Sequence, residues 1–200
     1  MKEAINFSRP PNAIRRANAA KRPGPYREKL IEVGAKLFVA RGIASVSVEQ
    51  LVEKAGVSRA TFYGFFANKN ELAAAILLPV FDSGIEALAN LVELSPRKAA
   101  EELISVYLYL WKEHRNALLL TSNLDRPVFP YIKLRHDAFN SVLQKVLRVI
   151  ESGGLLRNDS AALTLEVFAK TAIPLLRIYK DHEAPECIYR ESMLGLVIKV

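Results

Sequence analysis

The sequence predicts an all-α fold, and three observations carry that prediction. From residue 26 onwards apolar residues recur at spacings of three and four, the period of a helix with one buried face. No stretch of useful length alternates apolar and polar residues as a half-buried strand would. Capping and turn residues, such as Ser47, Gly56 and Ser58, divide the chain into segments of helical length. With 50% hydrophobic residues, a chain of 200 residues can bury a substantial core.

The first helix is expected to begin near Tyr26 and to end at Gly42, because glycine is the usual residue just past a helix end. Its apolar positions follow one another at spacings of four, three and one, so they share a single face that can be buried. These positions are Leu30, Gly34, Leu37 and Phe38.

Two short helices joined by a tight turn are expected next. Ser47 can cap the first of them, with Gln50 completing a capping box. Gly56 supplies the turn, since glycine tolerates positive φ, and Ser58 caps the following helix. A helix, a glycine turn and a capped second helix form the helix-turn-helix pattern, which places its second helix in the DNA major groove. The apolar side of that second helix consists of Phe62, Phe65 and Phe66.

The rest of the chain is expected to be helical to its end. Pro79 should kink or divide the helix that contains it, and Pro174 should bend a later one, because proline lacks the N–H of the helical hydrogen bond. Turn-forming residues around Asn123 and Asp125 should interrupt the helices. The helices are expected to begin at Asn68, at Ser95, after Pro130, at Asp159 or Ser160, and near Pro185.

Positive charge is concentrated in the N-terminal third. Residues 1–70 contain 13 Lys and Arg against 5 Asp and Glu, a balance of +8, whereas residues 71–200 contain 15 and 16, a balance of −1. Neutralising phosphates releases counterions, so this distribution favours nucleic acid in a salt-dependent way. Residues 1–25, rich in proline and basic pairs, are predicted to form a flexible basic arm. This arm either reaches a neighbouring groove or takes no part in binding.

The composition suits a reducing compartment. Cys187 is the only cysteine, so no disulfide can form within the chain. The N-terminus has no apolar run like that of a signal peptide, and there is no stretch of about 18 uncharged apolar residues. We therefore expect a cytoplasmic, nucleoid-associated protein with no membrane partner.

An enzyme is not expected. The sequence contains no nucleophile elbow, phosphate loop, dinucleotide fingerprint or H-E-x-x-H motif. His114, His136 and His182 lack the spacing of metal ligands on a helix, so we predict no catalytic residue, no metal and no cofactor.

Residues 26–75 resemble the TetR family of bacterial transcriptional repressors. The resemblance rests on Leu37, Phe38 and Gly42, on Ser47-Val48, and on the strings AGVSRATFYGFF and NKNEL. It implies a helix-turn-helix DNA-binding domain at 26–70 and a helical domain at 71–200 that binds an effector and dimerises. The family's last two helices pair with their mates, which implies a homodimer on a palindromic double-stranded DNA operator.

The resemblance also implies roles for single residues. Thr61 and Tyr63 match DNA-contacting positions, and Lys69 matches a phosphate contact. Arg59 could read a guanine edge or touch phosphate, and both remain open. Gly64 and Phe65 depart from the common family residues, so the operator sequence cannot be inferred from that of a relative. The predicted DNA-binding residues are Ser47, Val48, Ser58, Arg59, Thr61, Tyr63 and Lys69.

The second half should hold the effector site. A ligand pocket needs apolar walls with a few polar groups, and aromatic and polar residues recur between residues 95 and 180. We expect a hydrophobic or amphipathic molecule that releases a repressor from DNA, with motion localised at Pro79. The alternative is a DNA-binding adaptor of the same fold that acts in chromosome organisation or cell division without an effector. The predicted ligand-binding residues are Tyr107, Trp111, Phe129, Tyr131, His136, Phe139, Asn140, Phe168 and Thr171.

Overall fold

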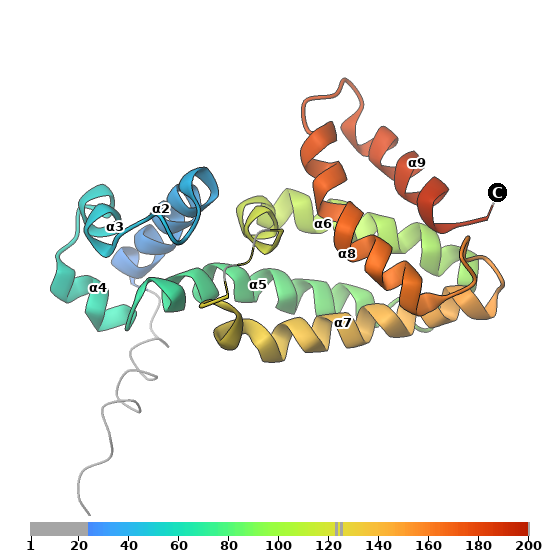
Figure 1. Cartoon of the computed structure of the whole chain (residues 1–200), viewed down its shortest axis with the longest axis horizontal. Coiled ribbons are helices and arrows are strands. Elements are labelled where there is room, and N and C mark those ends of the chain that lie inside the picture. Colours follow the sequence, from blue (N-terminus) through green and yellow to red (C-terminus); the bar gives the residue numbers. More distant parts are fainter. Residues whose placement is uncertain (1–23, 123, 125, 200) are drawn as a thin grey trace, which may run out of the picture.

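The prediction of an all-α protein is confirmed. A computed structural model describes residues 24–122, 124 and 126–199, and this part of the chain forms eight helices and no strand (Figure 1). The predicted arm lies outside the described residues except for its last two positions. Asn123 and Asp125, expected in an interhelical break, also lie outside them.

Three short helices form the N-terminal unit: α2 (Pro25–Arg41), α3 (Val48–Ala55) and α4 (Arg59–Phe65), at one end of the molecule (Figure 1). Pro25 occupies the first turn of α2, where its missing N–H costs no hydrogen bond, and Gly42 ends the helix with φ of 79°. The three helices are held by a shared core of fully buried side chains. This core includes Leu30, Phe38, Leu51, Ala55 and Phe62.

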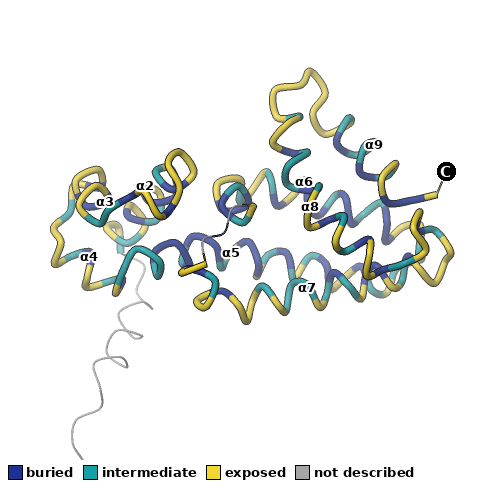
Figure 2. Tube along the Cα trace, in the orientation of Figure 1, coloured by how far each residue is buried: buried dark blue, intermediate teal, exposed yellow. Residues whose placement is uncertain are grey.

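Five helices form the C-terminal domain. Helix α5 runs from the N-terminal unit into this domain, where α6 and α7 pack against it and α7 and α8 against one another (Figure 1). Figure 2 shows buried positions along α5, while the loop between α8 and α9 is exposed. The bounds are α5 (Lys69–Ala89), α6 (Pro96–Thr121), α7 (Phe129–Ser152), α8 (Ala161–Tyr179) and α9 (Pro185–Val197).

Helix α5 joins the two units as one continuous element. The helix continues through Pro79 to Ala89, so Pro79 does not divide it. By length and composition α5 resembles a membrane-crossing helix, but half of its most apolar window is buried inside the protein. Its apolar character is therefore explained by its position in the core, between α2, α6 and α7.

The interruption that the sequence did not predict lies in α6. His114 has φ of −130° and ψ of 31°, which breaks the helical course, and its Nε2 lies 2.9 Å from the Ser83 hydroxyl of α5. The break separates a long first part of α6 from a short second part, residues 115–121. That second part lies beside the end of α2, and it runs in a different direction from the first part of α6.

Candidate DNA-binding surface and ligand cavity

Local hydrogen bonds fix the two helices of the helix-turn-helix. The Ser47 hydroxyl accepts from the Gln50 backbone N–H at 3.2 Å, and the Gln50 side chain accepts from the Ser47 N–H at 3.0 Å. Gly56 adopts the left-handed conformation, with φ of 62°, and ends α3. The Ser58 hydroxyl then accepts from the Thr61 N–H at 3.0 Å, which caps α4. The predicted capping box, turn and second cap are all present, so the angle between α3 and α4 is set within a few residues.

Helix α4 presents its polar residues outwards. Phe62 is completely buried, while Arg59, Ala60, Tyr63 and Gly64 are exposed. The Tyr63 side chain stays 47% exposed and meets the Phe62 ring edge-on, with 5.4 Å between ring centroids. This packing holds the phenol in one direction while its hydroxyl is free to contact a ligand. A guanidinium and a hydroxyl on one exposed helix face can donate to base edges or phosphates.

Thr61 and Ser58 share a hydrogen bond that the capping pattern did not require. Their hydroxyl oxygens lie 2.9 Å apart, and Thr61 is half-buried. Both side chains therefore already have protein partners, so a DNA contact from either one must share or replace that bond.

Arg59 has a partner that the sequence did not reveal. Its Nη2 lies 2.5 Å from Glu49 Oε1, so the first turn of α3 holds the first residue of α4. The Glu49 backbone N–H and the Ser47 side chain lower the pKa of the Glu49 carboxyl, and Arg59 lowers it further. The carboxylate is charged at neutral pH, so the predicted contact of the guanidinium with DNA would have to compete with this ion pair. An acid in the first turn of a helix was visible in the sequence, but its reach to Arg59 depends on the angle between α3 and α4.

Lys69 is tied to the loop before α3. Its ammonium donates to the carbonyl oxygens of Ala44 and Val46 at 2.7 and 2.8 Å. A lysine ammonium has three N–H donors, so one remains for the phosphate contact that was predicted. Lys69 thus has a structural role that the sequence did not indicate. It fixes the start of α5 to the segment that leads into Ser47 and Val48.

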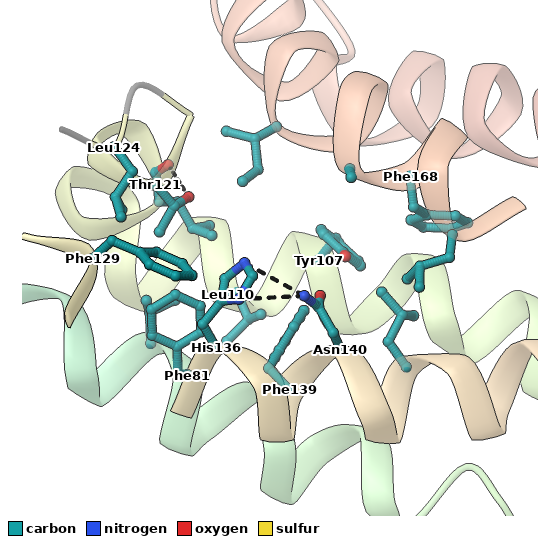
Figure 3. A pocket seen from close by; sticks show the side chains of 16 residues that line it. Phe81, Tyr107, Leu110, Thr121, Leu124, Phe129, His136, Phe139, Asn140 and Phe168 are labelled. Carbon is teal, nitrogen blue, oxygen red and sulfur yellow. Dashed lines mark hydrogen bonds between the residues drawn. The ribbon is translucent and has the colours of Figure 1, made fainter. Parts of the chain in front are cut away.

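The C-terminal domain encloses a cavity of about 200 Å³ between α5, α6, α7 and α8. Predicted ligand-binding residues that line it are Tyr107, Phe129, His136, Phe139, Asn140 and Phe168 (Figure 3). The remaining wall is mostly aliphatic, and such residues could not be told from ordinary core in the sequence. They are Val80, Phe81, Leu110, Leu118, Thr121, Leu124, Leu143, Leu165, Ala169 and Ile173.

Polar groups gather on the α7 side of the cavity. The Asn140 amide nitrogen lies 3.4 Å from each ring nitrogen of His136, a long and weak contact (Figure 3). The His136 ring is flanked edge-on by Phe81 and Phe129, with centroids 5.9 and 5.3 Å away. Among the described residues, no Asp, Glu, Lys or Arg lines the cavity. The cavity is therefore a mainly apolar and aromatic space with a few polar groups, and because it lacks Asp, Glu, Lys and Arg we call it the uncharged cavity.

Tyr107 of α6 also lines the cavity, with its ring 5.4 Å from the Phe168 ring. Burial raises the pKa of Tyr107 above its ordinary value, so the phenol is neutral. Tyr189 of α9, next to it, is also buried with a raised pKa, for the same reason.

Three predicted ligand-binding residues lie outside this cavity. Thr171 donates its hydroxyl to the Val167 carbonyl at 2.6 Å within its own helix. Tyr131 is 46% exposed, and its hydroxyl accepts from the Asn68 side chain at 3.0 Å, at the cap of α5. Periodicity placed these residues on the correct helices but could not show which way the helices turn.

Trp111, the third, lies in a separate hollow of about 260 Å³ where the end of α2 meets α6 and α8. We call this hollow the junction groove. It is lined by Phe38, Val39, Gly42, Ile43, Trp111, Arg115, Leu119, Leu120, Arg177 and Lys180.

Comparison with known proteins gives consistent relatives. Residues 30–76 match the family model of bacterial regulatory proteins, tetR family. The chain is 26% identical over 125 residues to YuxN of Bacillus subtilis, an uncharacterized HTH-type transcriptional regulator, covering 61% of this chain and 42% of that protein. It is 28% identical over 100 residues to the regulator EthR of Mycolicibacterium smegmatis, covering 48% and 46%. The chain thus matches less than half the length of these two relatives.

The whole fold is found among solved structures. The ketosteroid transcriptional regulator KstR2 of Mycobacterium tuberculosis superposes with a TM-score of 0.72 over 91% of this chain and 100% of that one, at 20% identity. At that identity the likeness concerns the fold. It extends the similarity from the N-terminal helices to the C-terminal helical domain.

Proposed function

Because this chain belongs to the TetR family of bacterial transcriptional regulators, we propose that it is a dimeric repressor whose effector is a small hydrophobic or amphipathic molecule. The effector enters the cavity and releases the protein from a palindromic operator. The observation that carries this proposal is that α4, capped by Ser58, exposes a polar face in one domain while the other domain contains an uncharged cavity.

The DNA-binding half of the proposal rests on the surface of α4. The helix has no basic residue other than Arg59, so nonspecific charge alone does not explain its exposed face. Thr61 and Tyr63 extend that face. At the N-terminus of α3 the Ser47 N–H already donates to Gln50, so the Val48 N–H is the group offered to a phosphate. We assign Arg59 and Tyr63 to base edges and Lys69 to a phosphate.

The ligand half rests on the chemistry of the cavity walls. Aromatic and aliphatic side chains favour an apolar molecule, and the absence of charged side chains among the described lining residues disfavours a fully ionised one. The weakly bonded pair of His136 and Asn140 can give up its 3.4 Å contact and bond a single hydroxyl, carbonyl or ester group instead. The effector class is therefore a neutral molecule with one hydrogen-bonding end.

The second part of α6 supplies a route between the two sites. Leu118 and Thr121 face the cavity, while Leu119 and Leu120 face α2 across the junction groove. A ligand that pushes this short segment therefore moves the N-terminal unit. The break at His114 separates the segment from the rest of α6, so this position favours motion more than Pro79 does, where α5 is continuous.

A homodimer through α8 and α9 is supported by their exposed apolar side chains. Leu163 and Ile178 of α8 are 53% and 65% exposed, and Leu196 of α9 is 43% exposed. Pairing these faces across a twofold axis would bury them and set two copies of α4 at the spacing of a palindrome.

Fluorescence polarisation with the DNA flanking the gene, repeated at several salt concentrations, tests this proposal. We expect saturable binding of two protomers per site and a loss of about tenfold or more in Tyr63→Ala, because a lost base contact costs about 1–3 kcal/mol. Arg148→Gln, an exposed charge change on α7, is the matched control and should leave affinity unchanged. Binding that is blind to sequence and vanishes with salt would contradict the proposal.

The effector arm uses the same complex. A panel of neutral ketones, alcohols and esters should include compounds that raise the Kd for DNA, and Asn140→Leu should weaken their effect without changing DNA binding alone. DNA binding that responds to no compound, at many scattered genomic sites, would indicate the adaptor function instead.

A further inference from the structure

The junction groove concentrates positive charge that has little protein compensation. Arg115 of α6, Arg177 of α8 and Lys180 line it, and no acidic side chain does so among the described residues. Lys180 pairs with Asp181 at 3.4 Å, whereas no described carboxylate pairs with Arg115 or Arg177. The C-terminal end of α8 offsets only about half a charge through its dipole. The groove therefore retains a positive potential that favours an anion.

The floor of the groove is apolar. Phe38, Ile43 and Leu120 are buried beneath it, and the half-buried Trp111 ring forms one wall. The Arg115 guanidinium lies over that ring, with its carbon 4.8 Å from the centroid. Its N–H groups form no ion pair with a described carboxylate, so they are available for an oxyanion. An apolar group can thus rest on the floor while its charged end meets Arg115 and Arg177.

Besides Asp181, which pairs with Lys180, a second acidic residue belongs to a neighbouring hollow that shares Trp111, Arg115 and Lys180 with the junction groove. Glu186 lines an adjoining hollow together with Lys112, Arg115 and Lys180, where basic side chains again outnumber it. It does not line the junction groove, so it leaves the positive balance of the groove in place.

We propose that the junction groove is a second ligand site, which binds a small anion with an apolar body, such as an aryl or alkyl carboxylate, sulfonate or phosphate ester. This site is separate from the uncharged cavity in its lining residues and in the charge of its ligand. Since its walls come from α2 on one side and from α6 and α8 on the other, the bound anion joins the DNA-binding unit to the C-terminal domain. The binding itself requires neither DNA nor an effector.

Trp111 makes the site directly observable, because it is the only tryptophan of the chain. The probes are 1-anilinonaphthalene-8-sulfonate and its uncharged counterpart N-phenyl-1-naphthylamine, titrated into the full-length protein. We expect the sulfonate to quench Trp111 emission saturably and to bind about tenfold more tightly than the neutral probe. Added salt should weaken the sulfonate and leave the neutral probe unchanged.

The decisive variant is Arg115→Gln with Arg177→Gln. It should lower the affinity for the sulfonate about tenfold and change the affinity for the neutral probe less than about twofold. Lys145→Gln with Arg148→Gln removes two exposed charges from α7 and should bind both probes like the wild type. Circular dichroism checks that both double variants are folded, and the salt dependence of the wild type tests the site independently of any variant.

Two outcomes would overturn the proposal. Equal sulfonate affinity in the wild type and in Arg115→Gln/Arg177→Gln would place the probe in the uncharged cavity. No saturable quenching by the sulfonate up to about 1 mM, the weak end of specific binding, would mean that the groove holds no such ligand.

Discussion

The helix-turn-helix and the cavity domain hold their polar groups in different ways. In α3 and α4, polar side chains bond to backbone groups three residues away, as Ser47 and Ser58 do. In the cavity, the polar contacts of His136 are all long: its ring nitrogens lie 3.4 Å from the Asn140 amide nitrogen, and its Nδ1 lies 3.4 Å from Asp137 Oδ1. The first arrangement makes a surface of fixed shape, which suits a rigid DNA groove. The second leaves an interior that a ligand can reorganise.

The largest expected effect on stability concerns the buried core beneath the helix-turn-helix. Phe62→Ala removes a completely buried ring from the N-terminal unit and should destabilise the protein by about 3–5 kcal/mol. Denaturant unfolding followed by circular dichroism measures the loss. Phe65→Ala is the matched control: its ring is only half-buried, so the loss should be clearly smaller. Equal losses would mean that α4 is not anchored mainly by Phe62.

The next effect concerns the wall of the cavity. A Cβ at Gly84 would lie 2.5 Å from the Phe139 ring, so Gly84→Ala must displace that ring and should cost about 1–3 kcal/mol. Gly64→Ala meets nothing within 4 Å on the exposed helix α4. It should instead stabilise the protein by up to about 1 kcal/mol, because glycine weakens a helix interior. Thermal unfolding of the two variants should therefore shift in opposite directions, and shifts of the same sign would contradict the close approach of α5 to α7.

A smaller effect on stability should distinguish an N-cap residue whose side chain makes a capping hydrogen bond from one whose side chain does not. Ser47→Ala removes both a hydroxyl acceptor and the capping box, with an expected loss of about 1 kcal/mol. Ser95 precedes α6, but its side chain makes no capping hydrogen bond, so Ser95→Ala should change the free energy of unfolding very little. Urea unfolding curves for the two variants make the comparison. A loss at Ser95 as large as that at Ser47 would contradict this assignment of the caps.

The smallest effect concerns competition for Arg59. Glu49→Gln removes the carboxylate that pairs with the guanidinium and should raise DNA affinity roughly two- to fivefold. Because the pKa of Glu49 is lowered, the carboxylate stays charged well into mildly acidic solution, and the advantage should disappear only when the pH falls through that lowered pKa. Glu53→Gln, an exposed change on the same helix with no such pair, is the control for DNA polarisation titrations. An equal gain in both variants would indicate general charge rather than competition.

The residues that line the C-terminal cavity show what a sequence pattern can and cannot predict about a site. Tyr107 and Phe168 were predicted because aromatic side chains on these helices can form apolar pocket walls, and both line the cavity. Trp111 lies one turn after Tyr107 on the same helix, yet it faces the junction groove. Leu118 and Thr121, which the sequence did not indicate, line the cavity because the break at His114 redirects the end of α6. The spacing of apolar residues predicts which helix a side chain belongs to. Which side chains it contacts depends on how that helix packs against the other helices.

The sequence by itself determined the all-α class, the position of the helix-turn-helix and its caps at Ser47, Gly56 and Ser58. It could do so because capping and left-handed turns depend on residues within about four positions of each other. Only the tertiary structure decided that Glu49 holds Arg59, that Lys69 holds the loop before α3, and which aromatic side chains enclose the cavity. Those contacts join separate helices, and their partners are selected by packing angles that no local pattern encodes.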